Sequence, residues 1–232
     1  MKKIMLLCAA VLLGVSCSSD ANQSLLSGNI RGIKKGTLYL QQIVDTTVVV
    51  LDSVVFSGDG QFEFNPEVTE PSLYYLYLDR KDENPYNDRL PIFLEDSKIQ
   101  VDAAWDTFAV TAKVSGSKTH DQYTEFQQMM SKFNQQNLAL MQQAMAMDPK
   151  TQQKAMDSLL DKNNKNELRR YLFAINYALN NRNSVIAPYV AVVEIPEASP
   201  VFLDSIYRSL PTDVAQTSYG RALEALLQNS TK

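Results

Sequence analysis

Residues 48–64 read VVVLDSVVFSGDGQFEF, and this stretch decides the fold class of the first half of the chain. Residues 48–56 are rich in β-branched side chains, which favour strands. Residues 57–60 contain an Asp-Gly pair and two glycines, which tolerate the positive φ angles of tight turns. Phe62 and Phe64 then follow at the two-residue spacing of a strand with one buried face. The sequence therefore predicts a β-hairpin with its turn at residues 57–60.

The same β pattern extends on both sides of this stretch, over residues 25–116. Further short strands are predicted at residues 38–41, 73–78, 92–94, 99–101 and 108–114, with a turn at residues 95–97. The last of them follows from alternating apolar residues at positions 108, 110, 112 and 114. Roughly eight short strands at this spacing favour an antiparallel β-sandwich-like domain over residues 25–116.

The pattern changes to helical spacing after residue 116. Ser117 or Thr119 can cap a first helix, and apolar residues recur at helical intervals as far as Met145. Asp148-Pro149 is a second start signal, because aspartate caps helices and proline suits the first helical position. Further helices are predicted around residues 185–193, 201–210 and 219–227. We therefore expect residues 117–232 to form a helical domain with a long αα-hairpin, which makes the chain an α+β protein.

The first 16 residues have the form of a secretory signal peptide. Residues 1–3 are basic at two positions, residues 4–15 are apolar, and Ser16 precedes Cys17. The apolar run of ~12 residues is shorter than the ~20 that a spanning helix needs. We therefore expect cleavage of residues 1–16 and not a transmembrane anchor.

Cys17 is expected to carry a lipid. Residues 13–17, LGVSC, resemble a bacterial lipobox, in which the cysteine takes a thioether-linked diacylglycerol and becomes the acylated N-terminus. Residues 17–24 are polar and aperiodic, which is typical of a tether. The predicted location is extracytoplasmic, with the N-terminal lipid holding the protein on a bacterial membrane, the outer membrane being favoured. The alternative is plain signal cleavage that leaves a free Cys17.

Charge and cysteine content exclude several classes of function. The chain has 22 basic and 26 acidic side chains, and its formal charge of −4 becomes −6 when Lys2 and Lys3 leave with the signal peptide. The other basic residues form no cluster, so no nucleic-acid partner is expected. Cleavage also leaves Cys17 as the sole cysteine, which excludes an intramolecular disulfide.

Side chains suited to catalysis or metal binding occur singly. The sole histidine, His120, lies at a predicted helix start and is expected to be solvated or to cap that helix. The charged segment 79–88 offers oxygen ligands at Asp79, Asp82, Glu83, Asn84 and Asp88, but it lacks the glycine-containing spacing of an EF-hand. We therefore predict no catalytic residue, no metal site and no cofactor.

Two groups of side chains have both a structural and a functional interpretation. Tyr74, Tyr75 and Tyr77 place aromatic rings on both faces of one strand; the face away from the core could bind sugars or peptides, but packing is favoured. The methionines could line an adaptable groove, although core packing is again favoured. These methionines are Met129, Met130, Met141, Met145 and Met147.

Three segments carry a family resemblance. They are LSGNI and GTLYL in residues 26–40, DSV and GDGQF in residues 52–62, and IFLE and VSGS in residues 92–117. Together they resemble the N-terminal β-domain of unknown function found in Bacteroidetes lipoproteins ahead of thioredoxin-like modules. The helical part, with LDSIY at 203–207 and SYG at 218–220, is similar to the linker region of the same proteins. The resemblance covers residues 25–227 and implies a fold family without a reaction.

The thiol–disulfide chemistry of those relatives depends on a C-x-x-C pair in the thioredoxin-like module. No cysteine follows Cys17 in the sequence to Lys232. Because this chemistry needs an attacking and a resolving thiol, the oxidoreductase activity is not expected here.

Four short motifs resemble the O-glycosylation signal of exported Bacteroidetes proteins, in which Ser or Thr follows Asp. Their hydroxyl residues are Thr46, Ser53, Ser158 and Ser205. The motif is short and is also expected by chance, so these positions are candidate modification sites.

The expected function is that of a membrane-anchored, non-enzymatic binding or scaffold module with a protein partner in the cell envelope. The alternative is an envelope carbohydrate-binding protein or hydrolase that uses carboxylates such as Asp79 or Glu95 beside the strand aromatics. A subunit that assists a separate thiol-redox protein is a third hypothesis.

Overall fold

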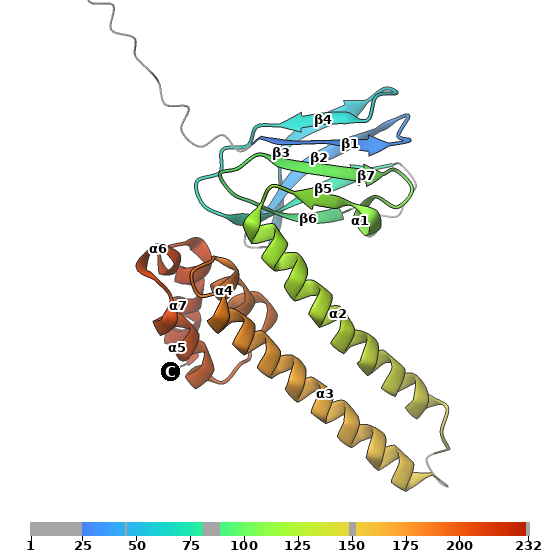
Figure 1. Ribbon diagram of the computed structural model, residues 1–232, viewed down its shortest axis with the longest axis vertical. Coiled ribbons are helices and arrows are strands. Elements are labelled where there is room, and N and C mark those ends of the chain that lie inside the picture. Colours follow the sequence, from blue (N-terminus) through green and yellow to red (C-terminus); the bar gives the residue numbers. More distant parts are fainter. Residues whose placement is uncertain (1–24, 45, 81–88, 149–151, 231–232) are drawn as a thin grey trace, which may run out of the picture.

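The computed structural model describes residues 25–44, 46–80, 89–148 and 152–230. In this part of the chain, eight strands form two four-stranded sheets, and helices follow them (Figure 1). The predicted α+β architecture, with a β-rich first part and a helix pair, is confirmed. The predicted signal peptide and tether, residues 1–16 and 17–24, lie outside the described residues.

The two sheets pack face to face around an apolar core. The first sheet has the strand order β4 (Gln61–Phe64), β1 (Leu26–Arg31), β7 (Ile99–Ala104) and β8 (Lys113–Ser115). The second has the order β3 (Thr47–Phe56), β2 (Gly36–Val44), β5 (Ser72–Asp79) and β6 (Arg89–Leu94). Strand alternation directs Leu38 and Leu40 of β2 into this core, as the sequence predicts.

One described strand pair departs from the predicted antiparallel arrangement. β1 and β7 run parallel, with Leu26 opposite Ile99 and Arg31 opposite Ala104, whereas the other described pairs are antiparallel. The cause is that the chain changes sheets between β6 and β7 and enters the first sheet at the end where β1 begins. A crossing between sheets permits parallel neighbours, which a short hairpin within one sheet does not.

Residues 57–60 connect the two sheets, so the prediction of a hairpin turn there is wrong. β3 pairs with β2 in the second sheet, while β4 pairs with β1 in the first. Phe56, Phe62 and Phe64 are all buried, and by changing sheets the chain keeps the three rings in the core. Gly60 fits the crossing closely: its carbonyl accepts a hydrogen bond from the Ile30 N–H (2.9 Å), and a Cβ atom would lie 2.2 Å from the Ile30 carbonyl oxygen.

Residues 108–114 do not form the single strand that their apolar alternation predicts. Residues Phe108–Thr111 form the short helix α1, and β8 begins only at Lys113. The N–H groups of Val110 and Thr111 both donate to the Thr107 carbonyl, at 3.0 and 2.9 Å. The alternation is misleading because Phe108 is buried whereas Val110 is 83% exposed, so the two do not share one buried face.

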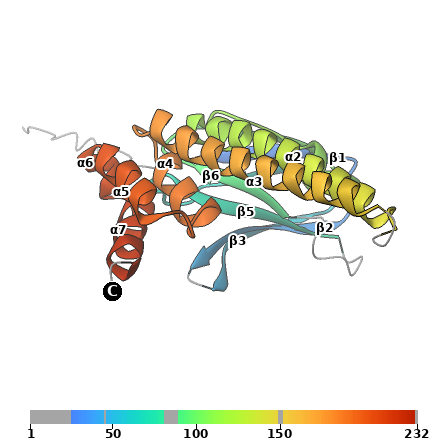
Figure 2. The same cartoon turned by 90° about the horizontal axis from the view of Figure 1, so that it is seen from below.

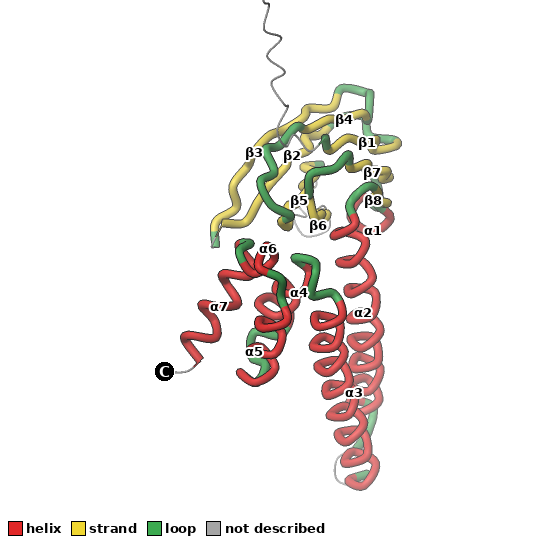
Figure 3. Tube along the Cα trace, turned by 60° about the vertical axis from the view of Figure 1, so that its left-hand side comes forward, coloured by secondary structure: helices red, strands yellow, loops and turns green. Residues whose placement is uncertain are grey.

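The predicted αα-hairpin consists of α2 (Lys118–Met145) and α3 (Gln153–Asn180), each 28 residues long. Ser117 is the cap of α2, since its hydroxyl oxygen accepts a hydrogen bond from the His120 N–H (3.0 Å). α3 begins at Gln153, directly after its cap position Gln152, so the predicted start with Pro149 as first helical residue is wrong; Pro149 itself lies outside the described residues. A helix of this length spans ~42 Å at 1.5 Å per residue, and the hairpin extends far beyond the sandwich (Figure 3).

The remaining helices form a cluster beside the base of this hairpin, at the end nearer the sandwich (Figures 1 and 2). They are α4 (Ile186–Tyr189), a π-helical turn (Val190–Glu194), α5 (Pro200–Ser209), α6 (Thr212–Ala215) and α7 (Ser218–Ser230). The predicted helices around residues 185–193, 201–210 and 219–227 are thereby confirmed. Within the described ranges, no helix combines the length and apolar composition needed to cross a membrane.

Phe93 of β6 is the sandwich residue buried in the second of two apolar cores, and its cross-strand neighbour Leu73 packs against the same core. The first core lies between the sheets, and the second lies among the helices and includes Phe93, which has no exposed surface. The Phe93 ring centroid lies 5.1 Å from that of Tyr189, 5.4 Å from that of Tyr123 and 6.3 Å from that of Tyr219. Aromatic pairs at such separations add favourable energy beyond the area that they bury. Phe93 therefore joins the sandwich to the helices.

Candidate functional site

Two carboxylates of the sandwich cap two helices at the place where the sandwich meets the helices, which we call the junction. Glu95, directly after β6, accepts hydrogen bonds from the Lys118 N–H (2.5 Å) and the Thr119 hydroxyl (2.6 Å) at the start of α2. Glu70 accepts the Ser218 N–H at the start of α7, at 3.0 and 3.1 Å from its two oxygens. Free N–H groups and the helix dipole both favour a carboxylate at these positions. The two caps fix the junction at two separate points.

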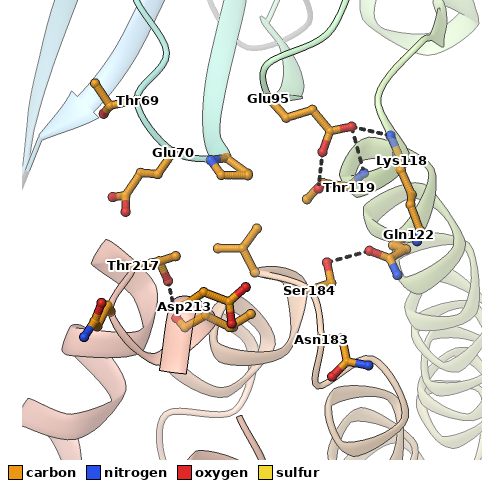
Figure 4. A pocket seen from close by; sticks show the side chains of 14 residues that line it. Thr69, Glu70, Glu95, Lys118, Thr119, Gln122, Asn183, Ser184, Asp213 and Thr217 are labelled. Atoms are coloured by element: carbon orange, nitrogen blue, oxygen red, sulfur yellow. Dashed lines mark hydrogen bonds between the residues drawn. The ribbon is translucent and has the colours of Figure 1, made fainter. Parts of the chain in front are cut away.

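A polar cleft of about 540 Å³ lies between these capped helix starts. Figure 4 shows Glu70 and Glu95 on its sandwich side, and Gln122 and Ser184 on its helical side, where the Ser184 hydroxyl donates to the Gln122 side-chain oxygen (2.6 Å). The other lining side chains are mostly hydroxyl, amide or carboxyl groups. They include Thr69, Thr119, Asn183, Asp213, Gln216 and Thr217.

The chemistry of the cleft suits polar binding better than catalysis. The carboxylates of Glu70 and Glu95 already accept hydrogen bonds from helix starts, and the Ser184 hydroxyl is directed to Gln122. A serine nucleophile needs an adjacent base; Lys118 also lines the cleft, but the Ser184 hydroxyl donates to the Gln122 amide oxygen, which is not a base. Polar contacts of this kind can orient a hydrophilic ligand but give no activated group.

The junction also contains tyrosines with little access to solvent. Burial raises the pKa of Tyr123, Tyr189 and Tyr219, to about 12 for Tyr219, and the nearby Glu194 carboxylate adds to the rise at Tyr123 and Tyr189. A general acid or base works best with a pKa near the ambient pH. These phenols therefore stay neutral, and their contacts with Phe93 make them packing residues.

His120 is buried between α2 and β6, so the solvated position expected for it is wrong. Its Nδ1 accepts a hydrogen bond from the Phe93 N–H (3.4 Å), and its Nε2 lies 3.3 Å from the Thr124 hydroxyl oxygen. Burial lowers the pKa of the imidazole, although the neighbouring Asp121 carboxylate acts in the opposite direction. In the part of the chain that the structure describes, no group of three or more His, Cys, Asp or Glu side chains could hold a metal ion.

Asp79 and Glu95, the carboxylates of the hydrolase alternative, lie at opposite ends of the second sheet. Glu95 follows Leu94, which pairs with Ser72 at the start of β5, whereas Asp79 is the last residue of β5. The seven steps from Ser72 to Asp79 correspond to about 23 Å of strand. Because glycosidase carboxylates lie ~5–9.5 Å apart, these two do not form such a pair. The remaining oxygen ligands of the charged segment, residues 82–88, lie outside the described residues.

The tyrosines of β5 divide between its two faces, as the strand pattern predicts. Tyr74 belongs to the core between the sheets, while Tyr77 lies on the outer face. There the Tyr77 ring stacks on Tyr39, with 6.1 Å between centroids, and the Arg89 guanidinium lies 5.4 Å from its centroid. The predicted packing role is thus confirmed for Tyr74 and Tyr77.

The candidate modification sites lie on separate surfaces. Thr46 is in the turn between β2 and β3, Ser53 is on β3, Ser158 is on α3 and Ser205 is on α5, and all four are exposed. Exposure is necessary for glycosylation, which stays a prediction at each position. Cys17 lies outside the described residues, and its lipidation likewise stays a prediction.

An apolar groove of about 260 Å³ lies near the free end of the α2–α3 hairpin. It is lined by Leu140, Met141 and Ala144 on α2, and by Met156, Leu159, Leu160 and Asn163 on α3. Met141 is 56% exposed, Leu160 is 60% exposed and Met145, on the next turn, is 77% exposed. The expected core role is therefore confirmed for Met130, which is buried, and wrong for Met141 and Met145, which are exposed; Met129 is half-buried and belongs to neither apolar core. We call this feature the hairpin groove.

Comparison with known families matches part of the chain. Residues 25–123 match the model of a domain of unknown function, DUF4369. The match spans the sandwich and the first turns of α2, including both ends of the bond between Glu95 and Thr119. Neither the curated proteins nor the solved structures gave a match. The predicted resemblance to an N-terminal domain of unknown function is thus supported for this segment.

Proposed function

We propose that the protein is an extracytoplasmic lipoprotein, held on a bacterial membrane by a lipid on Cys17, and that it acts as a non-enzymatic binding module for another envelope protein. The observation that carries the binding role is the hairpin groove. Monomeric proteins seldom expose contiguous apolar surface unless it binds something. The groove is also distant from the junction cleft, whose carboxylates serve as helix caps.

The chemistry of the hairpin groove fits an apolar helix of a partner. Leu138, Met141 and Met145 are exposed at spacings of three and four residues, which places them along one side of α2. Leu160 of α3 lies across the groove. The seam between two antiparallel helices can accept the ridge of a third, as in helix bundles. Methionine side chains adapt to the shape of such a partner.

Membrane fractionation of cells tests the anchor. Cys17→Ala is expected to move the protein out of the membrane fraction or to leave it unprocessed, because the acyl chains supply the affinity for lipid. The mass of the wild-type protein should correspond to cleavage before Cys17 plus the lipid. An unchanged membrane fraction for the variant would show that the anchor is wrong.

Charge substitutions in the hairpin groove test the binding role. Leu160→Lys is expected to reduce chemical crosslinking to the partner in intact cells by at least about tenfold, because a buried ammonium group is costly. Leu168→Lys is the matched control, since Leu168 is on the same helix and is 56% exposed against 60% for Leu160, but does not line the groove. Equal crosslinking of the two variants would contradict the binding role. Turnover of an envelope substrate by the purified protein would contradict the non-enzymatic part.

A further inference from the structure

The β2–β3 hairpin ends in an exposed apolar surface, which we call the apolar tip. It consists of Ile43, Val44, Val48, Val49, Val50 and Leu51, which are 37–52% exposed. β3 is an edge strand of the second sheet, and its residues 47–53 are exposed on both faces. Edge strands usually carry charges or proline that discourage contacts; here the charges are Asp45 and Asp52, and residues 46–51 between them contain neither charge nor proline. The apolar tip therefore needs an occupant.

A second copy of the chain is a poor occupant for this surface. The ten residues of β3 span about 33 Å, so pairing two such strands covers on the order of 300–400 Å² per partner. Stable protein interfaces bury roughly 800 Å² per partner. A dimer formed through this edge alone would thus be weak, whereas a lipid surface requires no matching strand.

The apolar tip projects from the end of the sandwich at which the chain enters the fold. β2 continues beyond Gln41, which pairs with Tyr75 near the start of β5, and Figure 3 shows the β2–β3 hairpin extending past its sheet. The start of β5 pairs with the end of β6, from which the chain passes directly to β7. The first residue of β7, Ile99, pairs with Leu26, the first residue of β1. The start of β1 and the apolar tip are therefore at the same end.

We propose that the apolar tip rests on the lipid surface beside the anchor and so fixes the orientation of the protein on the membrane. This inference rests on the proposed lipid anchor: the eight residues 17–24 would span at most about 29 Å, which keeps Leu25 close to the bilayer. Residues 43–51 contain one acidic residue, Asp45, and no Lys or Arg, so the contact is mainly apolar and does not require anionic lipids. The free backbone groups of β3 remain hydrated at headgroup depth.

This contact excludes one of the candidate modifications. Thr46 lies in the turn of the same hairpin, and a glycan on its hydroxyl would hold the apolar tip away from the lipid. The inference therefore predicts that the mature protein carries no sugar at Thr46. Peptide mass analysis of the protein purified from its native envelope tests this prediction. A glycan found on Thr46 would overturn the lipid contact.

Fluorescence quenching of the mature lipoprotein in phosphatidylcholine vesicles tests the contact directly. Val48→Cys introduces a reactive thiol for an environment-sensitive dye, since Cys17 is blocked by lipid and Cys8 leaves with the signal peptide. Val55→Cys is the matched control: both positions are exposed valines on β3, separated by about 23 Å of strand. Brominated lipids are expected to quench the dye at position 48 several-fold more than at position 55, and aqueous iodide should show the reverse.

The alternative outcomes separate this contact from the anchor. Equal iodide quenching at the two positions would overturn the contact while leaving the anchor intact. If neither quencher reaches a dye at position 48, another protein surface must cover the apolar tip. This result would also overturn the lipid contact. If the protein does not sediment with the vesicles, it lacks the lipid anchor. That result would contradict both the proposed function and the lipid contact. Matching thermal unfolding of the labelled variants and the wild type confirms that both are folded.

Discussion

At the scale of single residues, Phe93 carries the connection between the two cores. Phe93→Ala is expected to lower the free energy of unfolding by about 3–5 kcal/mol, because it removes a fully buried ring and leaves a cavity among three tyrosines. Urea unfolding measures this loss. Phe202→Ala is the control, since Phe202 is 39% exposed and should cost far less. Similar losses in the two variants would contradict the role of Phe93.

His120 should make stability depend on pH in a defined window. Burial lowers the pKa of its imidazole in the folded protein below the ordinary value of about 6.5. As the pH falls through about 6.5, the unfolded chain therefore binds a proton that the folded protein does not yet bind, and the free energy of unfolding decreases. The contribution of neutral His120 is fully present above about pH 6.5 and is lost between that pH and the lower folded pKa. Protonation at Nδ1 would also break the bond from the Phe93 N–H.

Comparison with His120→Gln isolates this effect, because the chain contains one histidine. The wild-type protein should lose more unfolding free energy between about pH 7.5 and about pH 5.5 than the variant does. Urea unfolding at the two pH values provides the measurement. Equal losses in the two proteins would show that His120 does not titrate in this window.

At the scale of structural elements, the crossing between β3 and β4 depends on the space around Gly60. Gly60→Ala is expected to destabilise the protein by about 3 kcal/mol, because the added methyl group would meet the Ile30 carbonyl oxygen at 2.2 Å. Gly58→Ala is a useful comparison: Gly58 has a φ of 108° but nothing within 4 Å of an added Cβ, so only backbone strain of about 1–2 kcal/mol applies. Thermal or urea unfolding ranks the two. A smaller effect at Gly60 would contradict the close fit of the crossing.

The same crossing shows how far the sequence could predict the fold. Local patterns identify most strands and helices, because each pattern reports which face of an element is buried. Residues 57–60 have the composition of a hairpin turn, yet the destination of the next strand depends on where Phe56 and Phe64 find their core. Apolar alternation around Val110 failed for a related reason, since alternation does not establish burial. Element type is thus local information, whereas the choice of sheet is not.

The candidate sites were predictable to a smaller extent. The sequence marks the methionines at the hairpin groove as candidates for a groove, but a helical pattern cannot distinguish a face that meets another element from one that stays open. The capping roles of Glu70 and Glu95 were missed, because their backbone donors are 148 and 23 residues away. A single sequence contains no local signal for such partners. By contrast, the sequence does predict Ser117 as a helix cap, because the N–H group that it caps, that of His120, is only three residues away.

At the scale of the whole molecule, the protein has two distinct ends. The sandwich is joined to the helix cluster through Phe93 and through the two carboxylate caps, and the α2–α3 hairpin extends from this body with its groove at the free end (Figure 1). Such an arrangement presents the groove far from the residues that would tether the chain. We propose that this groove holds a partner protein.

Site-specific photo-crosslinking in intact cells tests that claim most directly. A photoreactive residue at position 141 or 160, on either side of the hairpin groove, should form a covalent adduct with one and the same envelope protein, which mass spectrometry identifies. The same residue at position 110, which is 83% exposed on α1, should give no such adduct. We expect the shared adduct at positions 141 and 160 and not at position 110. No adduct at either groove position, or the same adduct from position 110, would contradict it.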